Sequence, residues 1–112
     1  MSAKLKRWWL KQKEAVLPAR RLVRVQGDEM PEHLPARRLV LLHDGSENWS
    51  IGMRCPCGCK ETIELMLLKA AKPRWDLTFN AKGQPSLSPS ILRRSGCRSH
   101  FWVRGGKVEW SY

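Results

Sequence analysis

Two cysteine-bearing segments, well separated in the chain, constrain its fold more than any other feature of the sequence. The first reads Cys55-Pro-Cys-Gly-Cys59 and the second Cys97-Arg-Ser-His100, and together they hold all four cysteines of the protein. Thiolate and imidazole are the ligands that zinc prefers, and four of them complete a structural tetrahedral site. The spacing therefore predicts two knuckles that close on one metal ion and tie the middle of the chain to its C-terminal part.

The two segments offer five candidate ligands for four positions, so one candidate must lie outside the coordination sphere. The candidates are Cys55, Cys57, Cys59, Cys97 and His100, of which we expect Cys57, Cys97 and His100 to bind. Zinc is the expected ion, and an iron–sulfur cluster is the alternative. The competing interpretation is buried free thiols or a disulfide pair, but two half-cystines one residue apart would form a strained ring.

The basic charge of the chain is concentrated at its two ends. Of the formal net charge of +11, residues 1–25 carry +7, residues 26–79 carry −1 and residues 80–112 carry +5. This distribution suits an acidic partner, either nucleic acid or a protein, although a basic surface can also serve solubility alone. The candidate nucleic-acid-binding residues are Lys4, Lys6, Arg7, Trp8, Lys11, Arg93, Arg94 and Arg98.

The first 17 residues have the pattern of a basic helix that ends before Pro18. Leu5, Trp8, Trp9, Gln12 and Val16 follow the spacing of three and four residues that marks one helical face. This helix either lays cations on phosphates while a tryptophan stacks on a base, or packs its tryptophans against its own domain. We favour packing. The domain division expected is an arm at residues 1–18 and a metal-binding β domain at residues 19–112.

The rest of the chain shows the alternation of short β-strands. Residues 49–54 alternate apolar and polar side chains, residues 75–79 do the same, and residues 101–103 and 108–110 flank a glycine turn. An internal repeat, at residues 17–23 and 34–40, predicts two more strands. Residues 63–68 are apolar on both faces and predict a central strand, whereas the serines of residues 87–91 are interpreted as loop filling. The fold class expected is mostly β, a small antiparallel sandwich or barrel with a metal knuckle and a short N-terminal helix.

Several of these segments together resemble a bacterial family of small domains of unknown function. The family pattern is C-x-C-G-C, a tryptophan, L-x-P-S-I, then C-x-S-H-[FY]-W followed by a glycine and a tryptophan. It is matched by residues 55–59, Trp75, residues 87–91, residues 96–102, Gly106 and Trp110. Members often lie near genes for ubiquitin-like conjugation, so the resemblance implies an accessory role in protein modification or defence and a protein partner from such a system. A looser likeness is to Rieske domains, because Cys97-x-x-His100 fits one of their two loops.

The motifs of known zinc enzymes are missing from the sequence. Neither H-E-x-x-H nor the H-x-E segment of zinc deaminases is present, although a spare cysteine with His100 could form a nucleophile pair. We therefore expect no catalytic residues and a non-enzymatic zinc module that binds an acidic partner. The alternative is a Rieske-like iron–sulfur domain for electron transfer or redox sensing. No apolar run approaches the length of a membrane span, so we also expect a cytoplasmic protein without a membrane partner.

Overall fold

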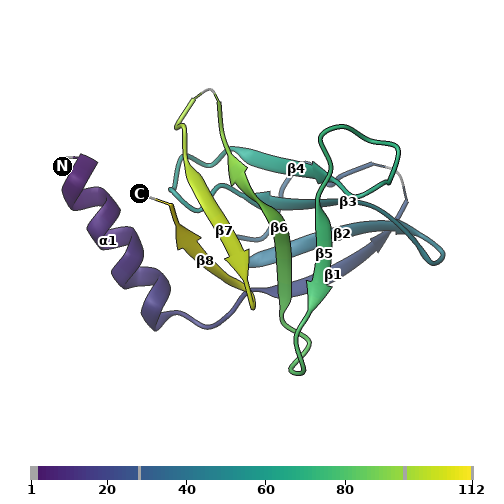
Figure 1. Ribbon diagram of the computed structural model, residues 1–112, viewed down its shortest axis with the longest axis horizontal. Helices are drawn as coiled ribbons and strands as arrows, with labels where there is room; N and C mark the ends of the chain where they lie inside the picture. Colours follow the sequence, from purple (N-terminus) through teal and green to yellow (C-terminus); the bar gives the residue numbers. More distant parts are fainter. Residues whose placement is uncertain (1–2, 28, 95, 112) are drawn as a thin grey trace.

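The computed structural model describes residues 3–27, 29–94 and 96–111, and within these ranges the chain forms one helix and two four-stranded sheets (Figure 1). The elements are α1 (Ala3–Val16), β1 (Arg21–Gln26), β2 (Arg38–Asp44), β3 (Glu47–Arg54), β4 (Thr62–Met66), β5 (Asp76–Phe79), β6 (Pro85–Leu92), β7 (His100–Arg104) and β8 (Lys107–Trp110). The mostly β fold with a short N-terminal helix is thus confirmed. The two sheets form an open sandwich and do not close into a barrel.

The first sheet has the strand order β1-β2-β3-β4, and its first pair is parallel. The two copies of the internal repeat lie side by side in register, with Leu22 opposite Leu39 and Val23 opposite Val40. Parallel neighbours require a connection that returns the chain to its starting end, which residues 27–37 provide. Strand β4 lies at the edge of this sheet, so the expectation of a central strand was wrong. Its outward side chains, Glu64 and Met66, are exposed, and only Ile63 and Leu65 are buried.

The second sheet has the order β5-β6-β7-β8 and is antiparallel throughout. Its strands run across those of the first sheet in Figure 1, and the inner faces of the two sheets enclose the core. The buried core side chains are Leu39, Ile51, Met53, Ile63, Leu65, Leu87, Ile91, Phe101, Val103 and Val108, together with Cys55 and Cys57. Burial of these apolar side chains supplies the main driving force for the sandwich.

Strand β6 replaces the loop that we expected at residues 87–91. Leu87 and Ile91 are both buried in the core, which fixes this segment as an inner strand of the second sheet. The register with β7 shifts between them: Leu87 pairs with Val103 and Ile91 with Phe101. Residues 88–90 therefore bulge opposite one residue, Trp102. Bulges of this kind re-aim side chains and are common beside active sites.

Helix α1 covers the outer edge of β8. Its inner face buries Glu14, whose carboxylate accepts a hydrogen bond from the backbone N–H of Val108 at 2.9 Å, and Leu10 packs against the core. A covered edge strand offers no template for pairing with another chain. Trp8 and Trp9 point away from the sandwich and are 56% and 53% exposed, so the favoured packing of the tryptophans on their own domain was wrong.

Candidate active site and cysteine cluster

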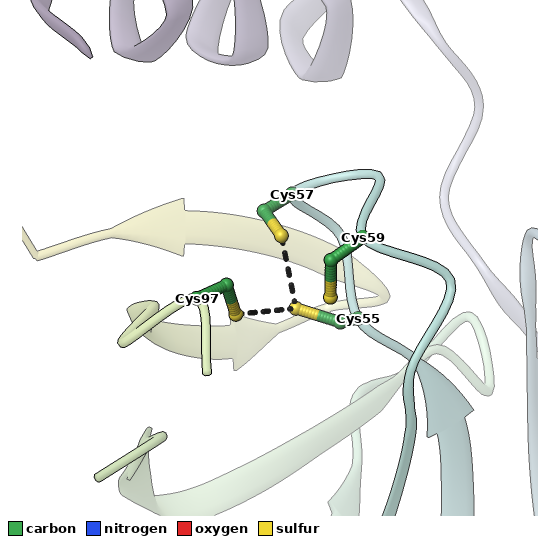
Figure 2. A group of neighbouring side chains, drawn as sticks. All are labelled: Cys55, Cys57, Cys59 and Cys97. Atoms are coloured by element: carbon green, nitrogen blue, oxygen red, sulfur yellow. Dashed lines mark hydrogen bonds between the residues drawn. The ribbon is translucent and has the colours of Figure 1, made fainter. Parts of the chain in front are cut away.

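The four cysteine sulfurs converge where the loop after β3 meets the loop between β6 and β7 (Figure 2). Cys55 Sγ lies 3.4 Å from the Sγ of Cys57 and 3.5 Å from that of Cys97. All four sulfurs, including that of Cys59, lie within 4.8 Å of one another. The first loop closes on itself through a hydrogen bond from the Cys55 N–H to the Glu61 carbonyl at 2.8 Å.

The thiols of the cluster differ in pKa. Burial, aided by hydrogen bonds that its thiol makes to Cys57 and Cys97, raises the pKa of Cys55 to about 12. Burial opposes ionisation of Cys97 as well, but hydrogen bonds from Ser99 and from the thiols of Cys55 and Cys57 outweigh it and lower the pKa of Cys97 to about 6. Protons are thus shared within the group, and a thiolate at Cys97 is the favoured anion.

The guanidinium of Arg93 lies beside this group. Burial alone would lower the pKa of Arg93, but its hydrogen bond to Cys55 and its attraction to the sulfurs of Cys97, Cys55 and Cys59 raise it. One guanidinium nitrogen, Nη1, is buried without a hydrogen-bond partner among the described residues. Arg93 therefore supplies positive charge where a cluster of thiolates would be negative.

The four cysteines could hold a metal ion. Zinc–thiolate bonds of about 2.3 Å in a tetrahedron place the sulfurs roughly 3.8 Å apart, close to the separations present here. A set of four thiolates suits zinc or iron–sulfur chemistry. His100 does not belong to this group of sulfurs: its ring faces a different partner, although it follows Cys97 by only three residues. Its expected role as a ligand stays a prediction.

The ring of His100 contacts a serine that the sequence analysis had interpreted as loop filling. His100 Nε2 and Ser90 Oγ lie 2.8 Å apart, and both side chains are half-buried. Ser90 sits at the end of the β6 bulge, where the indole Nε1 of Trp75 donates to its backbone carbonyl at 3.4 Å. A hydroxyl within hydrogen-bond reach of an imidazole is the arrangement of an activated nucleophile and its base.

The same hairpin carries this pair and one arm of the cysteine group. Ser90 lies on β6 and His100 begins β7, while the loop between them holds Cys97. The base of the loop is closed by a hydrogen bond from the Arg93 N–H to the Ser99 carbonyl at 2.8 Å. Ser99 is buried, and its hydroxyl lies 3.2 Å from the Cys97 sulfur. The contact between Cys97 and Ser99 thus fixes the loop at the residue that directly precedes His100.

The expected nucleic-acid-binding residues fall into two groups, five on α1 and three in the loop after β6. Lys6, Arg7 and Arg98 come together around a cavity of about 350 Å³, which Cys57, Cys97 and Ser99 also line. Arg93 lies against the sulfurs, as described above. A role in binding nucleic acid stays a prediction.

Ser90 is a candidate functional residue that was not predicted from the sequence. The sequence did mark the two residues, because Ser90 and His100 both lie in segments that match the pattern of the resembled family. A serine and a histidine ten residues apart carry no spacing rule, and only the pairing of β6 with β7 brings them together. Among the described residues, no helix is both long and apolar enough to cross a membrane.

Comparison with known proteins gives one match. No curated protein and no solved structure matches the chain. A family model described as "bacterial ubiquitination-like system serine protease (BubE)" matches residues 26–111. This description overturns two of our predictions, that the chain is not an enzyme and that it is a non-enzymatic zinc module. The Rieske-like alternative falls with them, since the description names a protease and not an electron-transfer domain. Because the match covers well over half of the chain, the protein belongs to the BubE family of serine proteases of bacterial ubiquitination-like systems.

Proposed function

We propose that this protein is a serine protease in which Ser90 is the nucleophile and His100 the general base. The observation that carries the assignment is the 2.8 Å contact between Ser90 Oγ and His100 Nε2. His43, by contrast, bonds through Nδ1 to the carbonyl of Gly45. The substrate class that we propose is a peptide or isopeptide bond in a protein of the ubiquitination-like system, in keeping with the family description.

The chemistry follows from the two side chains. Ser90 Oγ attacks the carbonyl carbon of the scissile bond while His100 Nε2 takes the hydroxyl proton. The C–N bond then breaks, and the leaving amine receives that proton from His100. A water molecule, deprotonated by the same nitrogen, hydrolyses the ester on Ser90 and restores the hydroxyl. In this cycle the neutral imidazole carries its proton on Nδ1, so that Nε2 is free to accept.

The position of the pair suits a macromolecular substrate. Ser90 and His100 lie on the outer face of the second sheet, the face opposite the buried Leu87, Ile91 and Phe101. Leu92 beside them is 53% exposed, and Trp102 lies opposite the bulge. An open face with apolar side chains around a nucleophile can accept an extended polypeptide without enclosing it. The β6 bulge turns Ser90 toward His100 across the gap between the strands.

We further propose that the four cysteines bind zinc and that the metal has a structural role. A zinc ion that is held by four thiolates has no open position for water or substrate, so it stabilises rather than reacts. Cys97 would anchor the loop that leads into His100, and Cys55, Cys57 and Cys59 would anchor it to the end of β3. Arg93 would offset part of the negative charge of the four thiolates.

Labelling with a fluorophosphonate probe tests the assignment, because such probes react with activated serines. We expect wild-type protein to gain one adduct, which tandem mass spectrometry maps to Ser90, and Ser90→Ala and His100→Ala to lose it. Ser88→Ala is the matched control, since Ser88 lies on the same bulge, is exposed and should leave labelling intact. An adduct on another serine, or labelling that survives in Ser90→Ala, would show that the nucleophile is wrongly assigned.

A further inference from the structure

Helix α1 turns its apolar stripe away from the protein. Leu5, Trp8, Trp9 and Val16 follow the spacing of a single helical face, yet they are 52%, 56%, 53% and 82% exposed. Two largely exposed tryptophans on one helix are unusual for a surface without a partner. The side chains that face the sandwich are Leu10 and Glu14, four residues apart.

The orientation of the helix is held by specific contacts. Glu14 is buried, accepts hydrogen bonds from Arg20 at 2.7 Å and Arg37 at 3.2 Å, and also accepts one from the Val108 N–H. At the C-terminal end of the helix, Lys107 Nζ donates to the carbonyl of Glu14 at 2.9 Å and to that of Leu17. A rotation of α1 that buried the tryptophans would leave the Glu14 carboxylate and its arginines without their partners, which is unfavourable for buried charged groups. The outward stripe is therefore a stable feature of the fold.

Lysines border the stripe on both sides. At 100° per residue, Lys4 and Lys11 lie beside Trp8, and Lys6 and Lys13 lie between the stripe and the sandwich. In the described part of the chain these four lysines form no ion pair, and α1 has one acidic residue, the buried Glu14. The surface is thus apolar and aromatic at its centre and cationic at its border. Tryptophan-centred surfaces of this kind are typical of binding hot spots.

We propose that the outward stripe of α1 and its bordering lysines dock an acidic-rimmed apolar surface on the protein substrate. This proposal rests on the proposed protease function and adds an exosite to it. The helix lies above the cysteine group in Figure 2. Lys6, Arg7 and Leu10 share a cavity with Cys97 and with Ser99, the residue that directly precedes His100. A substrate that is held on α1 would accordingly lie beside the hairpin that carries the nucleophile and base.

Two other occupants fit the surface less well. A second copy of the chain would bring like charges together, since α1 is basic and the net charge is +11. A lipid bilayer would have to bury Gln12, which lies at the centre of the stripe, with nothing to hydrogen-bond its amide. A protein surface can supply both the acidic rim and a partner for the amide.

The test measures binding of Ser90→Ala protein, which cannot turn over, to the ubiquitin-like protein of the same bacterium's ubiquitination-like system. We expect Trp8→Ala with Trp9→Ala to weaken the affinity about tenfold or more, and Lys4→Glu with Lys11→Glu to weaken it and flatten its salt dependence. The matched control residues line a different hollow, beside β1 and the β5–β6 turn. Phe79→Ala is the control for the tryptophan variant, and Arg24→Glu with Lys82→Glu is the control for the lysine variant. The controls should bind as tightly as the parent.

Kinetics separate the exosite from the catalytic assignment. With active enzyme, the tryptophan variant should raise KM for the protein substrate while leaving kcat, and cleavage of a short peptide spanning the same bond, unchanged. If Ser90→Ala cleaves as well as wild type, the protease assignment fails, but the binding comparison still decides the docking site. Equal binding by the tryptophan variant and its control overturns the proposal. So does tryptophan-dependent binding to vesicles of anionic lipid, or a tryptophan-dependent dimer, when the ubiquitin-like protein does not bind.

Discussion

The Ser90–His100 pair and the cysteine group share the β6–β7 hairpin but differ in their surroundings: Ser90 and His100 lie on the two strands, and Cys97 lies in the loop between them. In the cysteine group Cys55 and Cys57 are buried, Cys59 and Cys97 are exposed, and the four sulfurs lie close to one another. In the Ser90–His100 pair the hydroxyl and the imidazole are half-buried on the outer face of the sheet. Thiols that interact with one another suit a structural task. A hydroxyl–imidazole contact on an outer face, where a substrate can reach it, suits a reaction. Under the proposed assignments, the loop between β6 and β7 would link stability to catalysis.

Ser90→Ala gives the sharpest separation of the two regions. The variant should lose about 10³-fold or more in the rate of bond cleavage, because the nucleophile is gone, and should keep its Tm, because Ser90 lies outside the core. Steady-state cleavage assays and thermal denaturation measure the two effects. A large loss of Tm would mean that the Ser90–His100 contact is chiefly structural.

Removal of Cys97, a proposed metal ligand, should affect both regions. Cys97→Ser, or chelation of the wild type, should lower the free energy of unfolding by several kcal/mol and the Tm by roughly 10 °C or more, because metal binding and folding are coupled. Cleavage should fall in parallel, since the loop before His100 is released. Elemental analysis of wild type should find about one zinc per chain, and Ser88→Ala should retain it. A wild type that is free of metal and unaffected by chelator would break the comparison.

Ser99→Ala examines the link itself. Ser99 is buried against Cys97 and directly precedes His100, so loss of its hydroxyl should shift the imidazole. We expect kcat to fall about tenfold with KM little changed, as for an interaction that acts in the transition state. Ser86→Ala removes the hydroxyl that accepts from the Gly105 N–H at the far end of the same hairpin, and it should leave kcat unchanged. Equal effects of the two variants would argue against a specific link.

The smallest effect that we predict concerns Glu14, which lies in neither region. Burial would raise the pKa of Glu14, but hydrogen bonds from the Val108 N–H and Arg37, and the charge of Arg20, together lower it below its usual value. A lowered folded-state pKa contributes stability above the unfolded pKa, and that stability is lost as pH falls through the folded value. As the pH falls from 7 to 3, wild type should therefore lose stability that Glu14→Gln does not lose. Equal acid sensitivity of the two proteins in urea unfolding would contradict this.

Much of the fold could be predicted because alternation and knuckle spacing are local signals. Residues 49–54, 101–103 and 108–110 all lie in strands, and of the predicted strand at residues 75–79 all but Trp75 do, since β5 begins at Asp76. The failures share a physical cause. Residues 87–91 contain Pro89 and begin two residues after Pro85, and prolines are typical of loops. Burial of Leu87 and Ile91 in the core nevertheless makes this segment a strand. The tryptophans of α1 follow a core pattern, but an ion pair at Glu14 decides which face turns inward.

The sequence by itself determined which segments alternate as strands, which four thiols are available as metal ligands, and that the basic charge gathers at the two ends. Those properties depend on residue type and short spacing, which the chain carries whatever its fold. Tertiary structure alone decided that Ser90 meets His100, that the four sulfurs form a group apart from the imidazole, and that α1 faces outward with its tryptophans. Each of these depends on strand register or on packing between distant segments, and contacts of that range are set by the free energy of the whole fold.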